Sequence, residues 1–99
     1  LAVVIDTRLC QKAVDISQGA KFLICESTYL DRDKNLAYKH YHLTAKEAAT
    51  IAHDAGAHTL ILTHFSARYL NTEEFEEESR AIFPNTIIAE DFKKIPFPL

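Results

Sequence analysis

Short apolar runs alternate with longer amphipathic segments along the 99 residues. The apolar runs are rich in β-branched and aliphatic residues and three of them stop abruptly at a polar residue, which is typical of buried strands. Strands are predicted at 2–5, 22–25, 60–63 and 86–89, and helices at 9–18, 44–55 and about 71–82. Strands that alternate with helices favour a mainly parallel sheet with right-handed crossovers. The pattern predicts a β-α-β-α-β-α-β order and leaves the spatial order of the strands open.

Cap signals delimit the predicted helices. Thr44 and Glu47 have the spacing of a capping box, in which each side chain satisfies a free backbone amide at the start of the helix. Gly19 and Gly56 stand where a glycine commonly ends a helix. The alanines at 45, 48, 49, 52 and 55 share one helix face, which permits close packing against a sheet.

The remaining segments give weaker signals. Asn71 and Glu74 form a second possible cap, and Pro84 stops the helix behind it. Residues 29–41 are polar and aromatic, and "DRDKN" within them predicts a loop. The tail "FKKIPFPL" is predicted as an edge strand, with its prolines at 96 and 98 limiting the pairing.

Composition restricts the class of protein. A hydrophobic fraction of 47% and a charged fraction of 25% suit one small globular domain. No apolar run reaches the roughly 18 residues that a membrane span needs. The net charge of −3 argues against a surface that coats nucleic acid, but a nuclease with local contacts stays possible. Cys10 and Cys25 lie in apolar contexts and are interpreted as buried free thiols. Because the chain lacks methionine and begins inside an apolar run, we expect the C-terminal part of a longer protein.

Three predicted strands end in side chains with useful chemistry, namely Asp6, Glu26 and His64. Ligands bind at the carboxyl ends of the strands in parallel α/β sheets. Carboxylate oxygen and imidazole nitrogen both suit zinc, although a catalytic zinc needs a third protein ligand. Structural alternatives stay open: Asp6 as a helix cap, Glu26 as an acceptor for a loop amide, and His64 as a core histidine. His40 and His42 have HxH spacing, which alone is a weak signal, and His42 is equally typical of a surface residue before a helix cap.

Five segments resemble the C-terminal part of ribonuclease Z, the tRNA 3′-processing endonuclease of the metallo-β-lactamase superfamily. They are "VVIDTR", "LICESTYL", "HLTAKEAA", "LILTHFSARY" and "RAIFPNTIIAEDF", and they occur in the family's order and spacing over nearly the whole chain. The resemblance implies an α/β fold that is the C-terminal half of a metallo-β-lactamase-type αββα sandwich. Residues 1–99 would then be a single fragment of such a domain.

The resemblance also implies roles for individual residues. Asp6 matches an aspartate that bridges two zinc ions, and His64 matches a histidine that binds one of them. Glu26 and His42 match a pair that acts together, with the histidine giving a proton to the leaving oxygen. Two positions depart from the family pattern: Cys25 replaces the usual histidine, and Leu43 replaces the usual serine.

The implied function is zinc-dependent removal of the 3′ trailer from precursor tRNA, with two Zn²⁺ ions activating water and stabilising charge on the phosphate. Ser66 and Arg68 are expected to contact phosphate oxygens. The resemblance further implies a cytoplasmic homodimer without a membrane segment, or an organellar one if a targeting segment precedes it. The family's His-x-His-x-Asp-His motif, a further histidine ligand and the tRNA-binding arm lie upstream of these residues. We therefore expect the fragment alone to be inactive.

Two other functions stay open. One is a different metallo-β-lactamase-fold hydrolase that acts on another ester, which assays on precursor tRNA and on small phosphodiesters would distinguish. The other is a non-catalytic binding or assembly half-domain, whose metal site another segment completes. The zinc content of the isolated chain would separate an autonomous site from an incomplete one.

Overall fold

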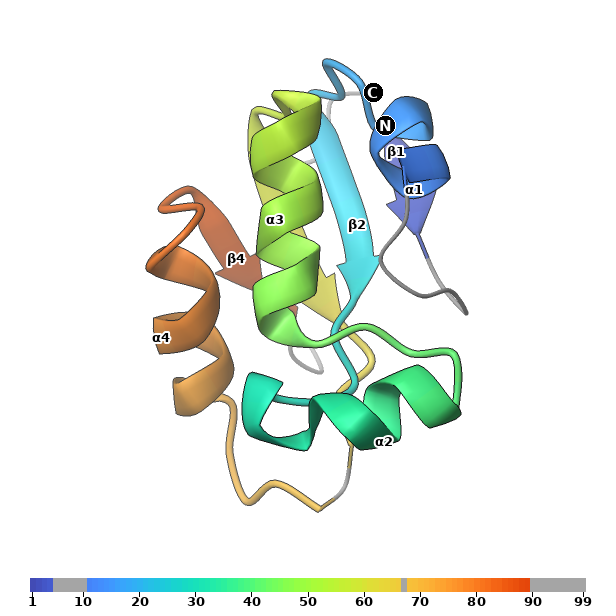
Figure 1. The fold of residues 1–99 in the computed structure, drawn as a ribbon. Helices are drawn as coiled ribbons and strands as arrows, with labels where there is room; N and C mark the ends of the chain where they lie inside the picture. The colour runs from blue at the N-terminus through green and yellow to red at the C-terminus, as the bar shows by residue number, and fades with distance from the viewer. Residues whose placement is uncertain (5–10, 67, 90–99) are drawn as a thin grey trace.

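A computed structural model describes residues 1–4, 11–66 and 68–89 and shows one parallel sheet with the order β1-β2-β3-β4 (Figure 1). The strands are β1 (Ala2–Val4), β2 (Phe22–Glu26), β3 (Thr59–Thr63) and β4 (Thr86–Ile88). The predicted parallel sheet is confirmed. Its spatial order, which the pattern left open, is sequential, so each crossover leads to the neighbouring strand.

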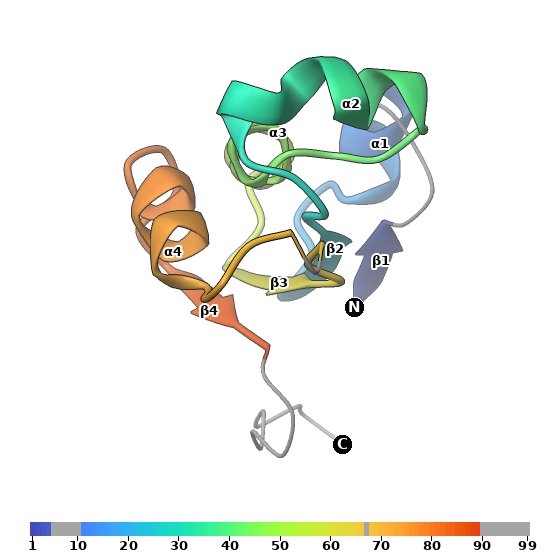
Figure 2. The ribbon, with the colours of Figure 1, turned by 90° about the horizontal axis from the view of Figure 1, so that it is seen from below.

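The helices of the described residues lie on one side of this sheet, as Figure 2 shows. They are α1 (Gln11–Ile16), α2 (Lys34–Lys39), α3 (Ala45–Ala55) and α4 (Glu73–Arg80), with a 3₁₀ turn η1 at Asp31–Asp33. Helix α3 lies over the middle of the sheet, and α2 lies beyond the carboxyl ends of the strands (Figure 1). No described helix is long and apolar enough to cross a membrane.

The two faces of the sheet carry different side chains because neighbouring residues of a strand point to opposite faces. The core beneath the helices contains four fully buried strand residues: Leu23, Cys25, Leu60 and Leu62. On the opposite face, one aliphatic residue from each strand stands in register: Val3, Ile24, Ile61 and Ile87. No helix of the described residues covers this row (Figure 2).

Helix α3 forms as its sequence predicts. The Thr44 hydroxyl accepts from the Glu47 amide at 3.1 Å and the Glu47 carboxylate accepts from the Thr44 amide at 3.0 Å, so the capping box is confirmed. Gly56 ends the helix with φ +66°, a conformation that glycine adopts without steric cost. The predicted alanine stripe is buried, which allows α3 to pack closely on the sheet (Ala45, Ala48, Ala49, Ala52, Ala55).

The loop predicted for "DRDKN" is wrong, because these residues form η1 and the start of α2. A six-residue helix is too short to show a clear period or to be stable on its own. It is held by tertiary contacts that the local sequence does not reveal. Leu30 and Ala37 are buried in the domain, and the Glu78 carboxylate of α4 accepts from the Asp31 amide at 3.0 Å.

The second predicted cap, formed by Asn71 and Glu74, is also wrong. The N-cap of α4 is Thr72, which makes no side-chain cap bond, and the helix ends at Arg80. The Asn71 side chain accepts from the Glu73 amide at 3.0 Å, whereas the Glu74 carboxylate pairs with Arg32. Cys25 is a buried free thiol as predicted. Cys10, the start of the helix predicted at 9–18 and the tail strand lie outside the described residues, and that helix ends at Ile16 rather than at 18.

Candidate active site

The carboxyl ends of β2 and β3 bring the predicted site residues together. Glu26 is the last residue of β2 and stands in register with Thr63, the last residue of β3. His64 follows directly, so both side chains leave the sheet at the same edge. Asp6 lies outside the described residues.

Glu26 is a buried carboxylate with four hydrogen-bond donors and is 1% exposed. One oxygen accepts from the Leu43 amide at 2.9 Å and faces Nδ1 of His42 at 3.2 Å. The other oxygen accepts from the amide and the hydroxyl of Thr28, at 3.2 and 2.5 Å. Burial of a carboxylate is tolerated only when its oxygens are satisfied. Glu26 therefore holds both ends of the segment 28–43. Its bonds to the amides of Thr28 and Leu43 also agree with the alternative in which Glu26 accepts from a loop amide.

The chain reversal at the end of helix α2 places the His42 side chain next to Glu26. Tyr41 has φ +59°, and the amide of His42 donates to the Ala37 carbonyl at 2.8 Å. The amide of Tyr41 donates to the Tyr38 carbonyl at 3.4 Å. These two bonds form a Schellman motif, in which a left-handed residue reverses the chain after a helix. His42 is thereby turned back towards the sheet, with its side chain 23% exposed.

The contact with Glu26 determines which nitrogen of His42 can exchange a proton. A carboxylate oxygen only accepts hydrogen bonds, so Nδ1 of His42 donates to it. The other ring nitrogen, Nε2, then carries the free lone pair or the second proton. A carboxylate that orients an imidazole in this way is the arrangement used by general acid–base pairs.

His64 turns out of β3 beside His42. Its φ is +64°, a left-handed conformation that histidine adopts more readily than most non-glycine residues. The ring centroids of His42 and His64 lie 5.9 Å apart. His64 is exposed, so the alternative of a buried core histidine is wrong. Phe65, the next residue, packs into the core against the edge of Phe75 with centroids 4.8 Å apart, which anchors the turn.

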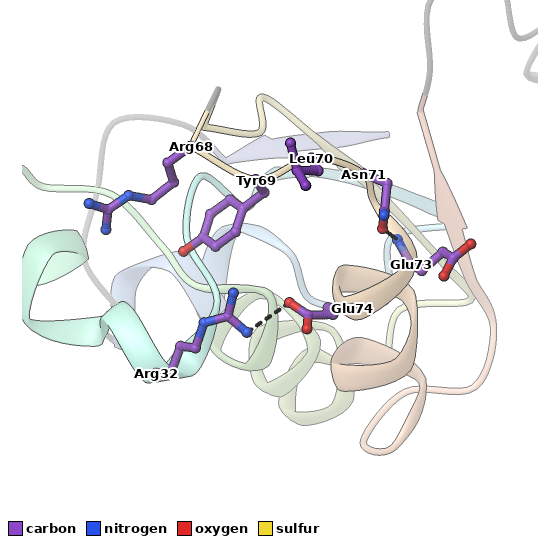
Figure 3. A pocket seen from close by; sticks show the side chains of 7 residues that line it. All are labelled: Arg32, Arg68, Tyr69, Leu70, Asn71, Glu73 and Glu74. Carbon is purple, nitrogen blue, oxygen red and sulfur yellow. Dashed lines mark hydrogen bonds and ion pairs between the residues drawn. The ribbon is translucent and has the colours of Figure 1, made fainter.

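Ser66 and Arg68 lie in the same loop and have partners inside the chain. The Ser66 hydroxyl accepts from the Arg68 amide at 3.3 Å. The Arg68 guanidinium lies 3.4 Å from a carboxylate oxygen of Asp33 and 6.0 Å from the centre of the Tyr29 ring. Arg68 also lines an open surface pocket beside the site, which Figure 3 shows with its seven lining residues.

Two residues near the site were not predicted from the sequence as functional residues. Tyr69 and Asp33 hydrogen-bond to each other at 2.6 Å across 36 positions of the chain. Their only signal was their place in the segments "LILTHFSARY" and "DRDKN". Burial, followed by the hydrogen bond to Asp33, raises the pKa of the Tyr69 hydroxyl above its ordinary value.

The donor atoms at this edge suit a metal ion but form only part of a site. The exposed imidazole of His64 is a suitable zinc ligand. Within residues 1–4, 11–66 and 68–89, no group of three or more His, Cys, Asp or Glu side chains converges. Cys25 is no candidate: burial, and then the charges of Glu26 and Glu47, raise the pKa of its thiol far above the ordinary range, and zinc binds the thiolate. His40, His53 and His58 are exposed, and none of them reaches the site.

Sequence comparison finds relatives over nearly the whole chain, although no family model matches it. A protein named ribonuclease Z from Chlamydia caviae is 56% identical over 98 residues, which are 99% of this chain and 32% of that protein. A ribonuclease Z from Protochlamydia amoebophila is 58% identical over 96 residues, which are 97% of this chain and 31% of that protein. The chain thus spans about a third of the length of these relatives, and the resemblance to the C-terminal part of ribonuclease Z is confirmed.

Structure comparison agrees with the sequence. The metallo-β-lactamase fold protein YhfI from Bacillus subtilis superposes with a TM-score of 0.80 at 25% identity, over 89% of this chain and 35% of that one. The short form of human tRNase Z superposes with a TM-score of 0.66 at 35% identity, over 87% of this chain and 28% of that one. The chain therefore has the architecture of part of a metallo-β-lactamase fold, as predicted.

Proposed function

We propose that this chain, which matches the C-terminal part of ribonuclease Z, supplies the proton-transfer pair and part of the metal site of an endonuclease that removes the 3′ trailer from precursor tRNA. The observation that carries the proposal is the buried Glu26 carboxylate on Nδ1 of His42, with His64 beside it. A general acid needs a fixed ring with one nitrogen facing the reaction. The Glu26 contact provides this arrangement.

In this proposal His42 protonates the oxygen that leaves phosphorus when the trailer is cut. Glu26 holds Nδ1, so that Nε2 faces the substrate and delivers the proton. The charge of the carboxylate stabilises the protonated ring before transfer and orients it afterwards. Glu26 is 1% exposed and its other oxygen is held by Thr28, so it has little freedom to serve as the acid itself.

The metal of the proposed site is zinc, held in this chain by His64 and Asp6. An imidazole and a carboxylate are both ordinary zinc ligands, and the remaining ligands would come from elsewhere in the protein. When bound, a zinc pair supplies activation of the attacking water and neutralisation of phosphate charge. The left-handed turn at His64 and the packing of Phe65 give the ligand a fixed direction.

Ser66 and Arg68 are proposed to contact phosphate oxygens of the substrate. Arg68 is paired with Asp33 at 3.4 Å, so phosphate binding there would share or replace this carboxylate. The guanidinium is exposed at the rim of the pocket in Figure 3 and can reach outward. The proposal includes a homodimer of the whole protein that acts in the cytoplasm.

The test is cleavage of precursor tRNA by the full-length protein and its His42→Ala variant. Loss of a general acid should slow cleavage by about 10²- to 10⁴-fold. An activated phosphodiester, bis(4-nitrophenyl) phosphate, should be affected far less, because its leaving group needs no proton. His53→Ala is the matched control, since His53 is exposed on α3 and pairs with its neighbour Asp54. Cleavage of precursor tRNA by His42→Ala at the normal rate would refute the role.

A second candidate is a metallo-β-lactamase-fold hydrolase for another ester. It draws support from the TM-score of 0.80 with YhfI, which is higher than that with human tRNase Z. The sequence identity runs the other way, at 25% against 35%, and favours the nuclease. If the full-length protein hydrolyses small esters but leaves precursor tRNA intact, this second candidate is correct.

A further inference from the structure

The side chain of Tyr69 joins the segment that carries His42 to the loop that carries His64. Its hydroxyl accepts from the Leu30 amide at 2.9 Å and donates to the Asp33 carboxylate at 2.6 Å. Its ring packs edge-on against Phe75, with centroids 5.0 Å apart and planes at 86°. Tyr69 is therefore fixed to the core through its ring and to the start of the His42 segment through its hydroxyl.

Two arginines flank this tyrosine, as Figure 3 shows. The Arg32 guanidinium lies 5.6 Å from the centre of the Tyr69 ring and hydrogen-bonds to Glu74 at 2.8 Å. Arg68 lies on the other side and pairs with Asp33 at 3.4 Å. Asp33 thus receives two partners from the His64 loop. We call Tyr69, Asp33 and Arg68 the latch.

The latch contacts the part of the segment that lies between the two ends held by Glu26. Glu26 fixes Leu43 and His42 at the far end and Thr28 at the near end. Between them, residues 30–41 lie outside the sheet as η1 and α2. Glu78 ties Asp31 to α4, but the direct link to the loop that carries His64 is the latch, together with the bond from the Ser66 amide to the Thr28 carbonyl at 2.9 Å.

We propose that Tyr69, acting through Asp33, is a positioning residue that fixes His42 relative to His64 for the reaction. The inference rests on the proposed function of His42 and His64. The two rings come from different segments and lie 5.9 Å apart at their centroids. A proton donor displaced by about 1 Å can lose about 10²-fold in rate. Removal of this link is therefore expected to lower the rate of proton delivery as well as the stability.

The kinetic test uses Tyr69→Phe in the full-length protein, because phenylalanine keeps the ring packing on Phe75 and removes only the hydroxyl. On precursor tRNA, kcat should fall about 10- to 100-fold with KM within about 3-fold, since proton delivery and not binding is disturbed. Bis(4-nitrophenyl) phosphate should lose less than about 3-fold, because its leaving group needs no proton. Asp33→Asn should give a smaller loss, because the amide oxygen still accepts from Tyr69.

The matched control is Tyr38→Phe, which makes the same chemical change on the exposed face of α2, where the tyrosine is 64% exposed. It should keep normal kinetics on both substrates. An equal loss on both substrates in Tyr69→Phe would mean general damage to the site and would overturn the proposal. An unchanged kcat on precursor tRNA would also overturn it.

A second measurement does not depend on activity. Tyr69→Phe removes the acceptor of the Leu30 amide, so amide hydrogen exchange over 28–43 should become about 10-fold faster, while β3 and α3 keep their rates. Unchanged exchange over 28–43 would overturn the proposal even if kcat falls. If the wild-type protein leaves precursor tRNA intact, the proposed function fails, and the exchange experiment still decides whether the latch orders the His42 segment.

Discussion

Replacing Glu26 by glutamine tests the core of the site with a change of a few atoms. The carboxylate accepts from two donors at each oxygen, and glutamine keeps only one oxygen. With its carbonyl towards Leu43 and His42, its NH₂ group faces the Thr28 amide and hydroxyl. The hydroxyl can rotate and accept from NH₂, whereas the Thr28 amide can only donate and loses its partner.

The expected loss of stability follows from this count. One buried amide without a partner costs about 1–3 kcal/mol. Thr28 is 7% exposed, so water replaces the lost acceptor poorly and a value near the middle, about 2 kcal/mol, is expected. For a protein larger than about 150 residues, this corresponds to a Tm lower by about 4–8 °C. Cleavage of precursor tRNA should fall less than in His42→Ala, because the ring keeps an uncharged acceptor.

The assay is thermal unfolding of the full-length protein followed by circular dichroism, with cleavage measured in parallel. Glu77→Gln is the matched control, since Glu77 is an exposed residue of α4 and such surface changes usually stay within about 0.5 kcal/mol. A Tm for Glu26→Gln as high as that of the control would refute the argument from the four donors. Cleavage at the wild-type rate would refute the orienting role.

Four further outcomes are expected. His64→Ala in the full-length protein should lower the zinc content measured by elemental analysis, whereas His42→Ala should keep it; zinc loss in His42→Ala would contradict the separation of roles. The isolated 99-residue chain should bind zinc substoichiometrically in equilibrium dialysis, because its described residues bring no three ligands together, and tight one-to-one binding would contradict this. Thr44→Ala should lower the free energy of unfolding by about 1 kcal/mol in urea, because it removes the acceptor of the Glu47 amide. Burial raises the pKa of the Glu78 carboxyl above its ordinary 4.5, so the folded state binds more protons than the unfolded state at pH values just above 4.5. The free energy of unfolding of the wild type, relative to Glu78→Gln, should therefore fall as the pH rises through this range. A rise, measured by urea titration, would contradict the assignment.

Local sequence patterns determined the elements whose stability is mostly local. The capping box at Thr44 and Glu47, the left-handed Gly56 and the alanine stripe of α3 were all predicted correctly. The buried strands were predicted because the strands of a parallel sheet are covered on both faces and are therefore short continuous apolar runs. The family resemblance, carried by five segments, is confirmed by relatives at 56 and 58% identity.

For the candidate site, the sequence pattern could predict only the position of the residues that end the strands. Glu26 and His64 could be expected at one edge because parallel strands place their carboxyl ends together. Their roles, and those of Asp6, His42, Ser66 and Arg68, stay predictions. The sequence could not show that His64 is exposed in a left-handed turn, since a histidine after a buried strand is equally compatible with a core position.

Only the tertiary structure decided how the region 28–43 folds and what holds it. Helix α2 has six residues and lacks the length for a readable period, so contacts from Glu26, Tyr69 and Glu78 determine its position. Each of these contacts joins residues that are 17 to 47 positions apart. Closing such loops costs conformational entropy, which burial elsewhere in the domain offsets. A local pattern carries no information about partners at that separation, which is why the residue that links the His42 segment to the His64 loop, Tyr69, emerged only from the folded chain.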